Sequence, residues 1–329
     1  MATFFNRIGR VEITSGTKVI YSTANGTATV NAVGSSLRAL DDIDFKFECT
    51  KVVDMTTYQN QARISILGLS RETIQFLATY RNMAEELKSQ KRVRIFASYK
   101  DWGDNLIFDG DITFARPSTP PENWLEIEAN VNGERGEELY SRSFQRNIRF
   151  YEAVEALARD MGLRNVQWKN CEDEEAIAEK RKIISYFEVR GTKAKIIKDL
   201  GRMTNFIVFE DCGSLILLYD ENTKTHAYSN MPVTISEENG MIGVPQVKQG
   251  LSQSGDNQQK FGELEVKSFI NPSVRVWGVV NIKSVYLPDM NGLYRVRQMT
   301  YSGHFRGQDW YQTMNLTKVN VPNVESVRG

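Results

Sequence analysis

The sequence has little of what metal centres, disulfide frameworks and most hydrolytic sites are built from. It holds three cysteines, Cys49, Cys171 and Cys212, and no CxxC pair, so neither a disulfide framework nor a zinc site is expected. Cys49 alternates with phenylalanines and is predicted to be a small buried residue. The two histidines, His226 and His304, have no cysteine, serine or second histidine at a spacing that is typical of a catalytic pair. We expect no metal and no cofactor.

An excess of charge of one sign and long apolar runs are also missing. Forty-one basic residues balance forty-one acidic residues, so the chain has no net charge at neutral pH. Binding to a DNA backbone requires a concentrated basic face, which disfavours a nucleic-acid module built on a small barrel with stacking aromatics. No apolar run approaches the ~20 residues of a membrane-spanning helix. The start, MATFFNRIGR, lacks the pattern of a secretory signal. We therefore expect a chain that is made in the cytoplasm and stays soluble.

The sequence does contain a repeated pattern of apolar residues in its first and last thirds. An isoleucine, a leucine, a threonine beside an apolar residue and a tryptophan follow one another with nearly equal spacing in both stretches. The matched residues are Ile95 with Ile282, Leu106 with Leu293, Ile112 with Met299, Thr113 with Thr300 and Trp124 with Trp310. Upstream, ARISILGLSRETI matches GELEVKSFINPSV without gaps, which pairs Ile64 with Leu264 and Ile66 with Val266. We interpret these matches as one small β-domain that occurs twice.

The repeat predicts which side chains form the core of each copy. In the first copy these are Ile64, Ile66, Leu106, Ile112, Thr113 and Trp124. In the second copy they are Leu264, Val266, Leu293, Met299, Thr300 and Trp310. The first copy also contains a helical pattern that the second has shortened, which predicts an additional helix at residues 78–90.

Between the two copies the pattern changes to helices mixed with strands. RFYEAVEALARDMGL and KAKIIKDLGRMTN have apolar residues at helical spacing, and NFIVFEDCGSLILLYD predicts a hairpin that turns at Asp211, Cys212 and Gly213. The charged segment 172–182 is predicted to be a short exposed helix or a solvated loop. GLSQSGDNQQKFG predicts a long mobile loop before the second copy.

The predicted fold class is thus mainly β with an α+β insertion. The expected domains are a first β-domain with an inserted helix over residues 1–143, a small α/β unit over 144–230 and a second β-domain over 231–329.

The order of these segments resembles the baseplate hub family of contractile phage tails, the group that includes the phage late-control protein D. ISILGLS with its following helix, then IFDGDI, resembles the first domain of that family. GVPQVKQG followed by ELEVKSFINPSVRVWGVVNIKS resembles the entry into its second domain, and LYRVRQMTYSGHFRGQDWYQTM resembles its ending. One departure is Phe305–Arg306, where the family pattern often has an acidic residue.

The resemblance implies a structural protein of the virion with two tail-tube-like β-barrel domains separated by the α/β unit. It further implies a homotrimer whose six barrels form a pseudo-sixfold ring, because a closed assembly needs matching surfaces. Such a ring adapts the hexameric tail tube to the trimeric central spike. Its other neighbours would be the tape measure protein and baseplate wedge proteins. DNA would pass through as cargo, and no membrane segment is expected.

Two alternatives fit the same sequence. The chain could be another β-barrel component of the tail tube or baseplate, or it could be a tail-associated cell-wall hydrolase. For the hydrolase the candidate carboxylates are Asp109, Asp111, Glu126 and Glu128. A glycosidase needs such a pair ~5–10 Å apart across a sugar-binding cleft. Neighbours on one strand more often face solvent, so we expect no enzymatic activity.

Overall fold

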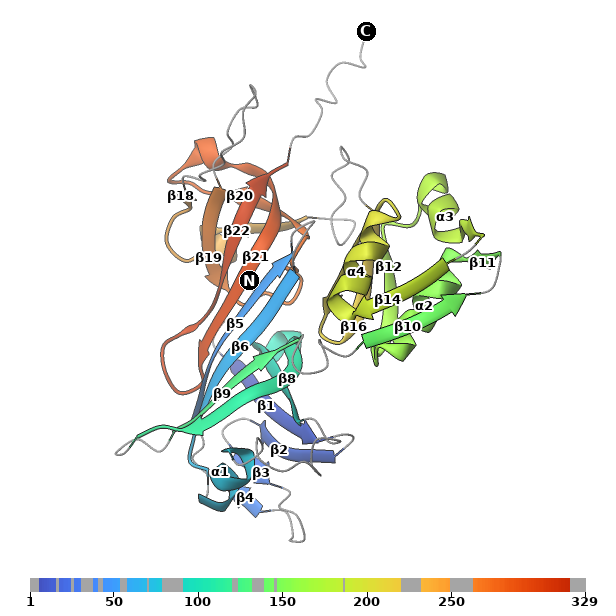
Figure 1. Cartoon of the computed structure of the whole chain (residues 1–329). Helices are drawn as coiled ribbons and strands as arrows, with labels where there is room; N and C mark the ends of the chain where they lie inside the picture. Colours follow the sequence, from blue (N-terminus) through green and yellow to red (C-terminus); the bar gives the residue numbers. More distant parts are fainter. Residues whose placement is uncertain are drawn as a thin grey trace.

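The computed structural model describes residues 6–15, 18–24, 27–30, 38–40, 44–53, 58–69, 71–78, 91–119, 124–131, 139–144, 147–185, 187–219, 232–248 and 263–319. His226, the predicted loop 250–262 and residues 79–90 of the predicted additional helix lie outside these described residues. The described part of the chain is mainly β with a smaller α/β unit beside the strands, as the sequence predicts (Figure 1).

Most strands belong to one large sheet (Figure 1). Its main path runs in the order β18-β19-β22-β21-β5-β6-β9-β8-β7-β1-β2-β3-β4, and β20 and β17 extend from the side of β21. The strands are β1 (Arg7–Ser15), β2 (Lys18–Ala24), β3 (Thr27–Val30), β4 (Arg38–Leu40), β5 (Asp44–Val53), β6 (Tyr58–Leu67), β7 (Lys91–Tyr99), β8 (Leu106–Pro117), β9 (Trp124–Asn130), β17 (Val233–Ser236), β18 (Gln246–Lys248), β19 (Glu263–Phe269), β20 (Val279–Lys283), β21 (Gly292–His304) and β22 (Trp310–Lys318).

The two ends of this sheet repeat the same pairing order. In the first half β6 pairs with β9, β9 with β8 and β8 with β7. In the second half β19 pairs with β22, β22 with β21 and β21 with β20. β5 flanks β6 as β18 flanks β19, and β1 flanks β7 as β17 flanks β20, although β17 runs in the opposite direction. Thr113 on β8 and Thr300 on β21 therefore lie on equivalent strands.

The long strand β21 joins the halves. Its residues 292–295 pair with β20, whereas residues 298–304 pair with β5 of the first half. The described strands consequently form one open sheet, not two separate closed barrels. The physical reason is that β21 extends past the end of β20, and its free backbone groups are taken up by β5.

The halves differ in the connection that follows β6 or β19. In the first half α1 (Arg71–Ala78) packs Ile74 and Leu77 against the core. In the second half residues 271–278 make turns in which Trp277 is buried. Of the predicted additional helix at 78–90, the described residues include only Ala78, which ends α1.

The α/β unit contains the helices α2 (Phe150–Asp160), α3 (Glu174–Arg181) and α4 (Lys193–Arg202). Its strands are β10 (Leu139–Phe144), β11 (Ile148–Arg149), β12 (Asn165–Lys169), β13 (Ile183–Ile184), β14 (Phe187–Thr192), β15 (Phe206–Asp211) and β16 (Ser214–Tyr219). α2 and α4 confirm the two predicted helices, and α3 confirms a short helix in the charged segment. The predicted hairpin is also confirmed, because β15 and β16 are joined by Cys212 and Gly213 with φ of 49° and 77°. β10 pairs with β14, so this unit begins at Leu139.

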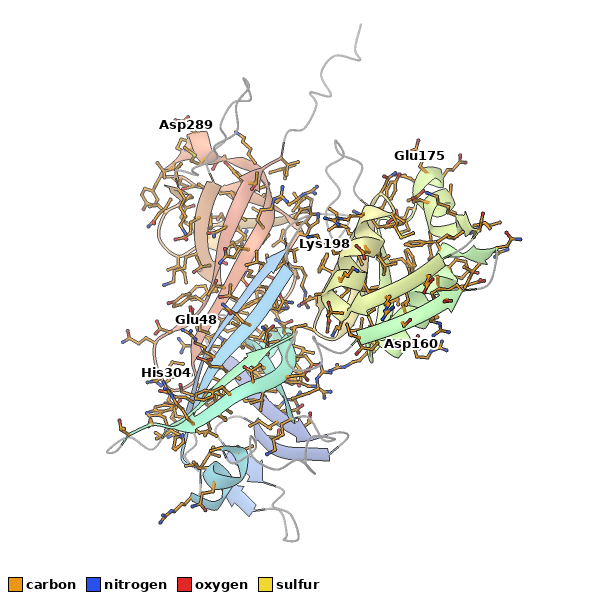
Figure 2. The ribbon with its side chains drawn as sticks, viewed as in Figure 1. Glu48, Asp160, Glu175, Lys198, Asp289 and His304 are labelled. Atoms are coloured by element: carbon orange, nitrogen blue, oxygen red, sulfur yellow. The ribbon has the colours of Figure 1, made fainter. Side chains whose placement is uncertain are left out.

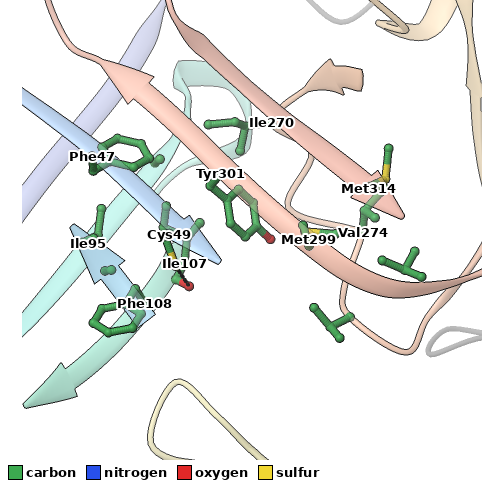
Figure 3. Close-up of a cluster of buried hydrophobic side chains, with 14 of the residues drawn as sticks. Phe47, Cys49, Ile95, Ile107, Phe108, Ile270, Val274, Met299, Tyr301 and Met314 are labelled. Atoms are coloured by element: carbon green, nitrogen blue, oxygen red, sulfur yellow. Dashed lines mark hydrogen bonds between the residues drawn. The ribbon is translucent and has the colours of Figure 1, made fainter. Parts of the chain in front are cut away.

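The two halves of the sheet share one apolar core, and the α/β unit has a second (Figure 3). Figure 3 shows Cys49 of the first half beside Tyr301 of the second, and the strand register pairs these two residues. β16 lies between the two cores. Ile216 and Leu218 face the shared core, while Leu215, Leu217 and Tyr219 face the core of the α/β unit. Burial on both sides explains the unbroken apolar run SLILLY.

Candidate functional site

The first candidate catalytic pair, Asp109 and Asp111, is buried in ion pairs. Asp109 has no exposed side-chain surface and contacts Arg92 at 3.2 Å, Arg94 at 3.4 Å and Arg164 of the α/β unit. Asp111 lies 3.7 Å from the Arg92 Nε atom. A catalytic carboxylate must reach substrate. Asp109 is enclosed by arginines, so its geometry is that of a structural anion.

The second candidate pair, Glu126 and Glu128, lies on the solvent-facing side of β9. Glu126 contacts Arg116 of β8 at 2.7 Å, and Glu128 lies 3.6 Å from Arg63 of β6. Both contacts are exposed cross-strand pairs. The two carboxylates project from one strand face and do not oppose each other across a cleft, as a glycosidase would require.

The cysteines and the described histidine also have structural surroundings. Burial raises the pKa of Cys212 to about 12 and raises the pKa of Cys49 and Cys171 as well, so the thiolate nucleophile is disfavoured. The Nε2 atom of His304 lies 2.6 Å from the Asp44 carboxylate, which also accepts the backbone N–H of Arg306. This pair fixes the turn between β21 and β22. Among the described residues no group of His, Cys, Asp and Glu side chains could hold a metal ion.

A second polar contact joins the α/β unit to the sheet at β5 and β6. The Lys51 ammonium pairs with Asp211 and lies 3.3 Å from the Cys212 sulfur. The Asn60 side chain donates to the backbone carbonyl of Glu210 at 3.1 Å. Cys212 donates to the carbonyl of Leu106 at 3.4 Å. Together with Asp109 and Arg164, these contacts hold the β15–β16 turn on the first half of the sheet.

The charges in this contact perturb one another in opposite directions. Burial acts to raise the pKa of Asp211, but the Lys51 ammonium outweighs it and holds the pKa of Asp211 below its ordinary value. Burial also raises the pKa of the neighbouring Glu210, and Lys193, which pairs with it at 2.5 Å, offsets only part of that rise. Asp211 is thus stabilised as an anion, and Glu210 is not.

The predicted core residues are buried to different degrees. Exposure is at most 2% for the innermost set, which consists of Ile64, Ile66, Leu264, Val266, Met299 and Trp310, and it is 9% for Trp124. Leu106, Ile112 and Leu293 are half-buried, so their predicted enclosure is wrong in degree. Thr113 and Thr300 are half-buried as well. Thr113 donates its hydroxyl to the carbonyl of Glu128, and the Thr300 hydroxyl lies 3.3 Å from that of Thr50 across the junction of the halves.

The strand register corrects the residue-by-residue match of the two copies. A β-bulge interrupts the pairing of β8 with β9 between Ile112 and Phe114, and one interrupts that of β21 with β22 between Val296 and Gln298. We call residues counterparts when the register gives them the same place in both halves. Thr113 is then the counterpart of Arg297, not of Thr300, because the bulges displace the spacing in the sequence.

The two tryptophans are not counterparts either. The register makes Tyr311 the counterpart of Trp124. Trp310 points into the core, where its indole N–H donates to the carbonyl of Ser98 at 3.3 Å. Trp124 lies on the other face of the sheet, with the Lys46 ammonium 4.3 Å from its ring. Ile95 and Ile282 keep the equivalence that the sequence suggested.

Since the candidate carboxylates, the cysteines and His304 have structural surroundings, the candidate functional surface is the duplicated sheet itself. Its solvent-facing side is polar. Figure 2 shows Glu48 and His304 on the same side of the first strands, with Asp289 at the far end of the second half. A shallow groove on this side is lined by Glu48, Arg63, Ser302 and His304. None of the helices in the described part of the chain has the length and apolar character to cross a membrane.

Comparison with known proteins relates this architecture to phage tails. The family model described as baseplate hub gp41 matches residues 27–316. No curated protein sequence matches the chain. The fold is similar to that of the tail protein from Neisseria meningitidis MC58, with a TM-score of 0.57 at 9% identity over 95% of this chain and 97% of that one. It is also similar to a chain of the lidded Francisella PdpA-VgrG complex, with a TM-score of 0.53 at 7% identity. That match covers 97% of this chain and 54% of the other, so this chain spans about half of its length.

Proposed function

The chain belongs to the baseplate hub gp41 family, and from this membership we propose that it acts as a trimeric adaptor between the tail tube and the central spike. As a member of that family it is a structural component of a phage tail baseplate. The trimeric state, the neighbours and the passage of DNA are the further parts of the proposal.

The observation that carries the proposal is the repeated strand order within one chain. Each chain offers two sheet halves with the same pairing order, β6-β9-β8-β7 and β19-β22-β21-β20. Three chains would place six such halves around an axis. One side of that ring would match a sixfold tube, and the ring as a whole would keep the threefold symmetry of a spike.

The open sheet supports closure by neighbouring chains. The predicted tube-like domains need not be closed within one chain, because adjoining subunits can cover the exposed ends of the sheet. Eight consecutive strands of the main path run from β18, at one end of the described sheet, to β8. The path continues from β8 to β7 and β1. In this proposal these eight strands line the ring, and the expected first and last domains correspond to two ring units, with the α/β unit, which starts at Leu139 and not at residue 144, on the outside.

The polar face suits a channel through which DNA passes. Its exposed side chains carry both signs of charge, among them Lys46, Glu48, Arg63 and Glu128. A surface of this kind lacks the concentrated basic charge that would retain DNA. The ion-paired settings of Asp109 and Glu126 support a structural role over a hydrolytic one.

Reconstruction of an assembled tail tests the proposal. We expect three copies of this chain in one ring, with the tube protein on one face and the spike on the other, and with tape measure or wedge proteins as further neighbours. A ring of six identical copies of this chain would refute it, because sixfold matching would then need no duplication. Muralytic activity of the purified chain would instead support the hydrolase alternative.

A further inference from the structure

The junction between the two halves includes a strand pair and an aromatic corner. In the strand pair, residues 298–304 of β21 lie opposite residues 46–52 of β5. In the corner, Tyr99 at the end of β7 packs edge-on against Trp102 and against Phe269 of the second half. The Tyr99 hydroxyl donates to the carbonyl of Trp310 at 3.3 Å, and Tyr99 is only 2% exposed.

The two strands of the strand pair have counterparts at the ends of the described sheet. The register makes β18 the counterpart of β5, with Val247 in the place of Cys49. It makes the last residues of β8, 114–117, the counterpart of 298–301 in β21. Tyr286 follows Ile282 at the same interval in the sequence as Tyr99 follows Ile95, but it lies in the loop after β20, whereas Tyr99 ends strand β7. β18 and the end of β8 lie at opposite ends of the eight-strand path, and no described strand pairs with their outer edges (Figure 1).

The counterparts are exposed where the junction residues are buried. Val247 is 51% exposed and Cys49 is fully buried, and Tyr286 is 73% exposed whereas Tyr99 is 2% exposed. Large exposed apolar side chains among the described residues gather on these elements. Six of the nine are Phe114 near the end of β8, Val244 and Val247 at β18, and Val285, Tyr286 and Leu287 in the loop after β20, whereas Leu139, Ile183 and Met203 belong to the α/β unit. Apolar side chains grouped in this way mark a surface that another protein covers.

The loop that carries Tyr286 is held in place by hydrogen bonds. The Glu237 carboxylate accepts from the Ser284 hydroxyl at 2.7 Å and from the backbone N–H of Val285 at 3.2 Å. The Asn291 side chain accepts the backbone N–H of Ser284 at 2.6 Å, and the Ser284 hydroxyl accepts that of Leu287. A fixed loop that presents apolar side chains binds at low entropic cost.

From these observations we infer that a second copy of this chain is the partner, and that it repeats between chains the contact seen within one chain. β18 and the loop residues 285–287 of one copy bind residues 114–117 of β8 and the Leu67–Trp124 end of the β6–β9 pair in the next copy. The contact is head-to-tail, so a suitable rotation closes it into a ring. The inference rests on the proposed ring and names the surfaces that would form it.

Pro117 restricts this contact without preventing it. The backbone N–H of Ser118 donates to the carbonyl of Trp124 in β9. Because backbone groups alternate in direction along a strand, those of Pro117 face the outer edge of β8. Proline offers no N–H there, which is a common protection of an edge strand. Its carbonyl still accepts a hydrogen bond, and in the inferred contact the donor is the backbone N–H of Val247. The edge is therefore weakened against indiscriminate pairing and remains able to bind this partner.

Cysteine cross-linking tests the strand pairing. Thr50 and Thr300 face each other in the junction, and their counterparts are Lys248 and Arg116. Such non-hydrogen-bonded pairs have Cα atoms about 4.5 Å apart, within the range that a disulfide spans. Full-length protein carrying Arg116→Cys and Lys248→Cys, oxidised and run on a non-reducing gel, is expected to give covalent dimers and trimers. Thr50→Cys with Thr300→Cys should instead close a disulfide within one chain.

The wild type and each single cysteine variant, oxidised in parallel, account for the native thiols. A ladder that ends at three chains supports both the pairing and the proposed trimer. A ladder that continues beyond three supports the pairing and refutes the trimer. Absence of cross-links between chains, while the Thr50–Thr300 control closes, overturns the inferred pairing, and the trimeric function then depends on the tail reconstruction.

Charge substitution tests the apolar loop. In the double-cysteine protein, Tyr286→Asp is expected to lower the yield of cross-linked chains about tenfold or more, since a charge would then be buried in the contact. The matched control is Ile183→Asp, because Ile183 is 62% exposed but lies on the α/β unit. Equal yields from the two variants would exclude the loop from the contact.

Discussion

The two halves of the large sheet share a pairing order but differ in what is attached to them. The first half has the ten-residue strand β5, the helix α1 and the docked α/β unit, whereas the second has the three-residue strand β18 and turns in place of the helix. The shared pairing order is what the two halves would need in order to occupy equivalent positions in a ring. The attachments distinguish one copy from the other, so one chain can present similar surfaces for a tube and dissimilar surfaces for its other neighbours.

The ion pairs that join the α/β unit to the sheet come from Lys51 and Asp109 of the first half, and Arg275 of the second half adds a positive charge that acts on Asp211. Asp109 binds Arg164 of that unit, and its counterpart in the second half is Leu293. Apolar core positions agree between the halves, as Ile127 with Met314 and Ala129 with Leu316 show. The difference indicates that a few buried charges decide where the unit docks, while apolar packing keeps the sheet common to both halves.

The largest effect is expected when Asp109 of the first half is replaced by leucine, the residue that its counterpart Leu293 has in the second half. Asp109→Leu removes the fully buried carboxylate that Arg92, Arg94 and Arg164 share, and these arginine side chains are 23%, 31% and 45% exposed. Breaking a buried ion pair in this way typically costs about 3–5 kcal/mol of unfolding free energy. Urea unfolding would measure the loss. Asp104→Leu is the control, because Asp104 pairs with Arg10 but is 51% exposed, and its loss should stay below about 1 kcal/mol.

The reverse exchange in the core should have the next largest effect. Met299 is fully buried in β21, and its counterpart in β8 is Ala115. Met299→Ala is expected to leave a cavity and to cost about 2–5 kcal/mol. Leu293→Ala should cost less, because Leu293 is half-buried. Thermal unfolding of both variants would compare them, and a larger loss for Leu293→Ala would contradict the burial of these two residues.

Much of the fold follows from local patterns in the sequence. Period-two alternation identified strands such as β5 and β6, and helical spacing identified α2 and α4. The duplication was visible because the same strands recur in the same order. Alternation gives the face of a strand but not its register. The bulges at Thr113 and Arg297 therefore displaced the match, and tryptophans on opposite faces were paired.

The contacts between distant segments could not be predicted. Nothing near Asp109 in the sequence indicates Arg164 as its partner, and Lys51 is far from Asp211 along the chain. The available signal is the pair of carboxylates in the segment IFDGDI, Asp109 and Asp111, which are also the candidates for the hydrolase alternative. Buried carboxylates in a strand indicate either a reactive site or an ion-paired contact, and only the positions of the arginines distinguish the two.

A pH series would sharpen the account of how the unit is held on the first half. The folded-state pKa of Asp211 lies below its ordinary value of 3.8 because of Lys51, so the stability from its ionised form is present above 3.8 and is lost as the pH falls through the lower folded value. The difference in unfolding free energy between the wild type and Asp211→Asn should therefore be constant at pH values above 3.8 and should become smaller as the pH falls below 3.8. Urea unfolding across the range would measure it.

The contribution of Glu210 to stability is expected to change with pH in the opposite direction to that of Asp211. Its folded-state pKa is raised above 4.5 by burial, so the stability it contributes is present at low pH and declines as the pH rises from 4.5 through the raised value. The difference in unfolding free energy between the wild type and Glu210→Gln should therefore change with pH above pH 4.5 and stay constant below pH 3.8. If both differences changed in the same direction with pH, the assignment of the Lys51–Asp211 pair would be wrong.

The smallest effect is expected on the exposed face, where the halves differ in charge without a structural consequence. Glu126 and Glu128 have the counterparts Thr313 and Asn315, and both glutamates make exposed pairs with arginines. Glu126→Thr with Glu128→Asn should change the unfolding free energy by less than about 1 kcal/mol, because exposed ion pairs contribute little. Since the second half already carries these residues on a sheet of the same order, tail assembly should also be unchanged. Complementation of a phage that lacks this chain would measure infectivity, and loss of infectivity together with loss of a muralytic activity present in the wild type would favour the hydrolase alternative.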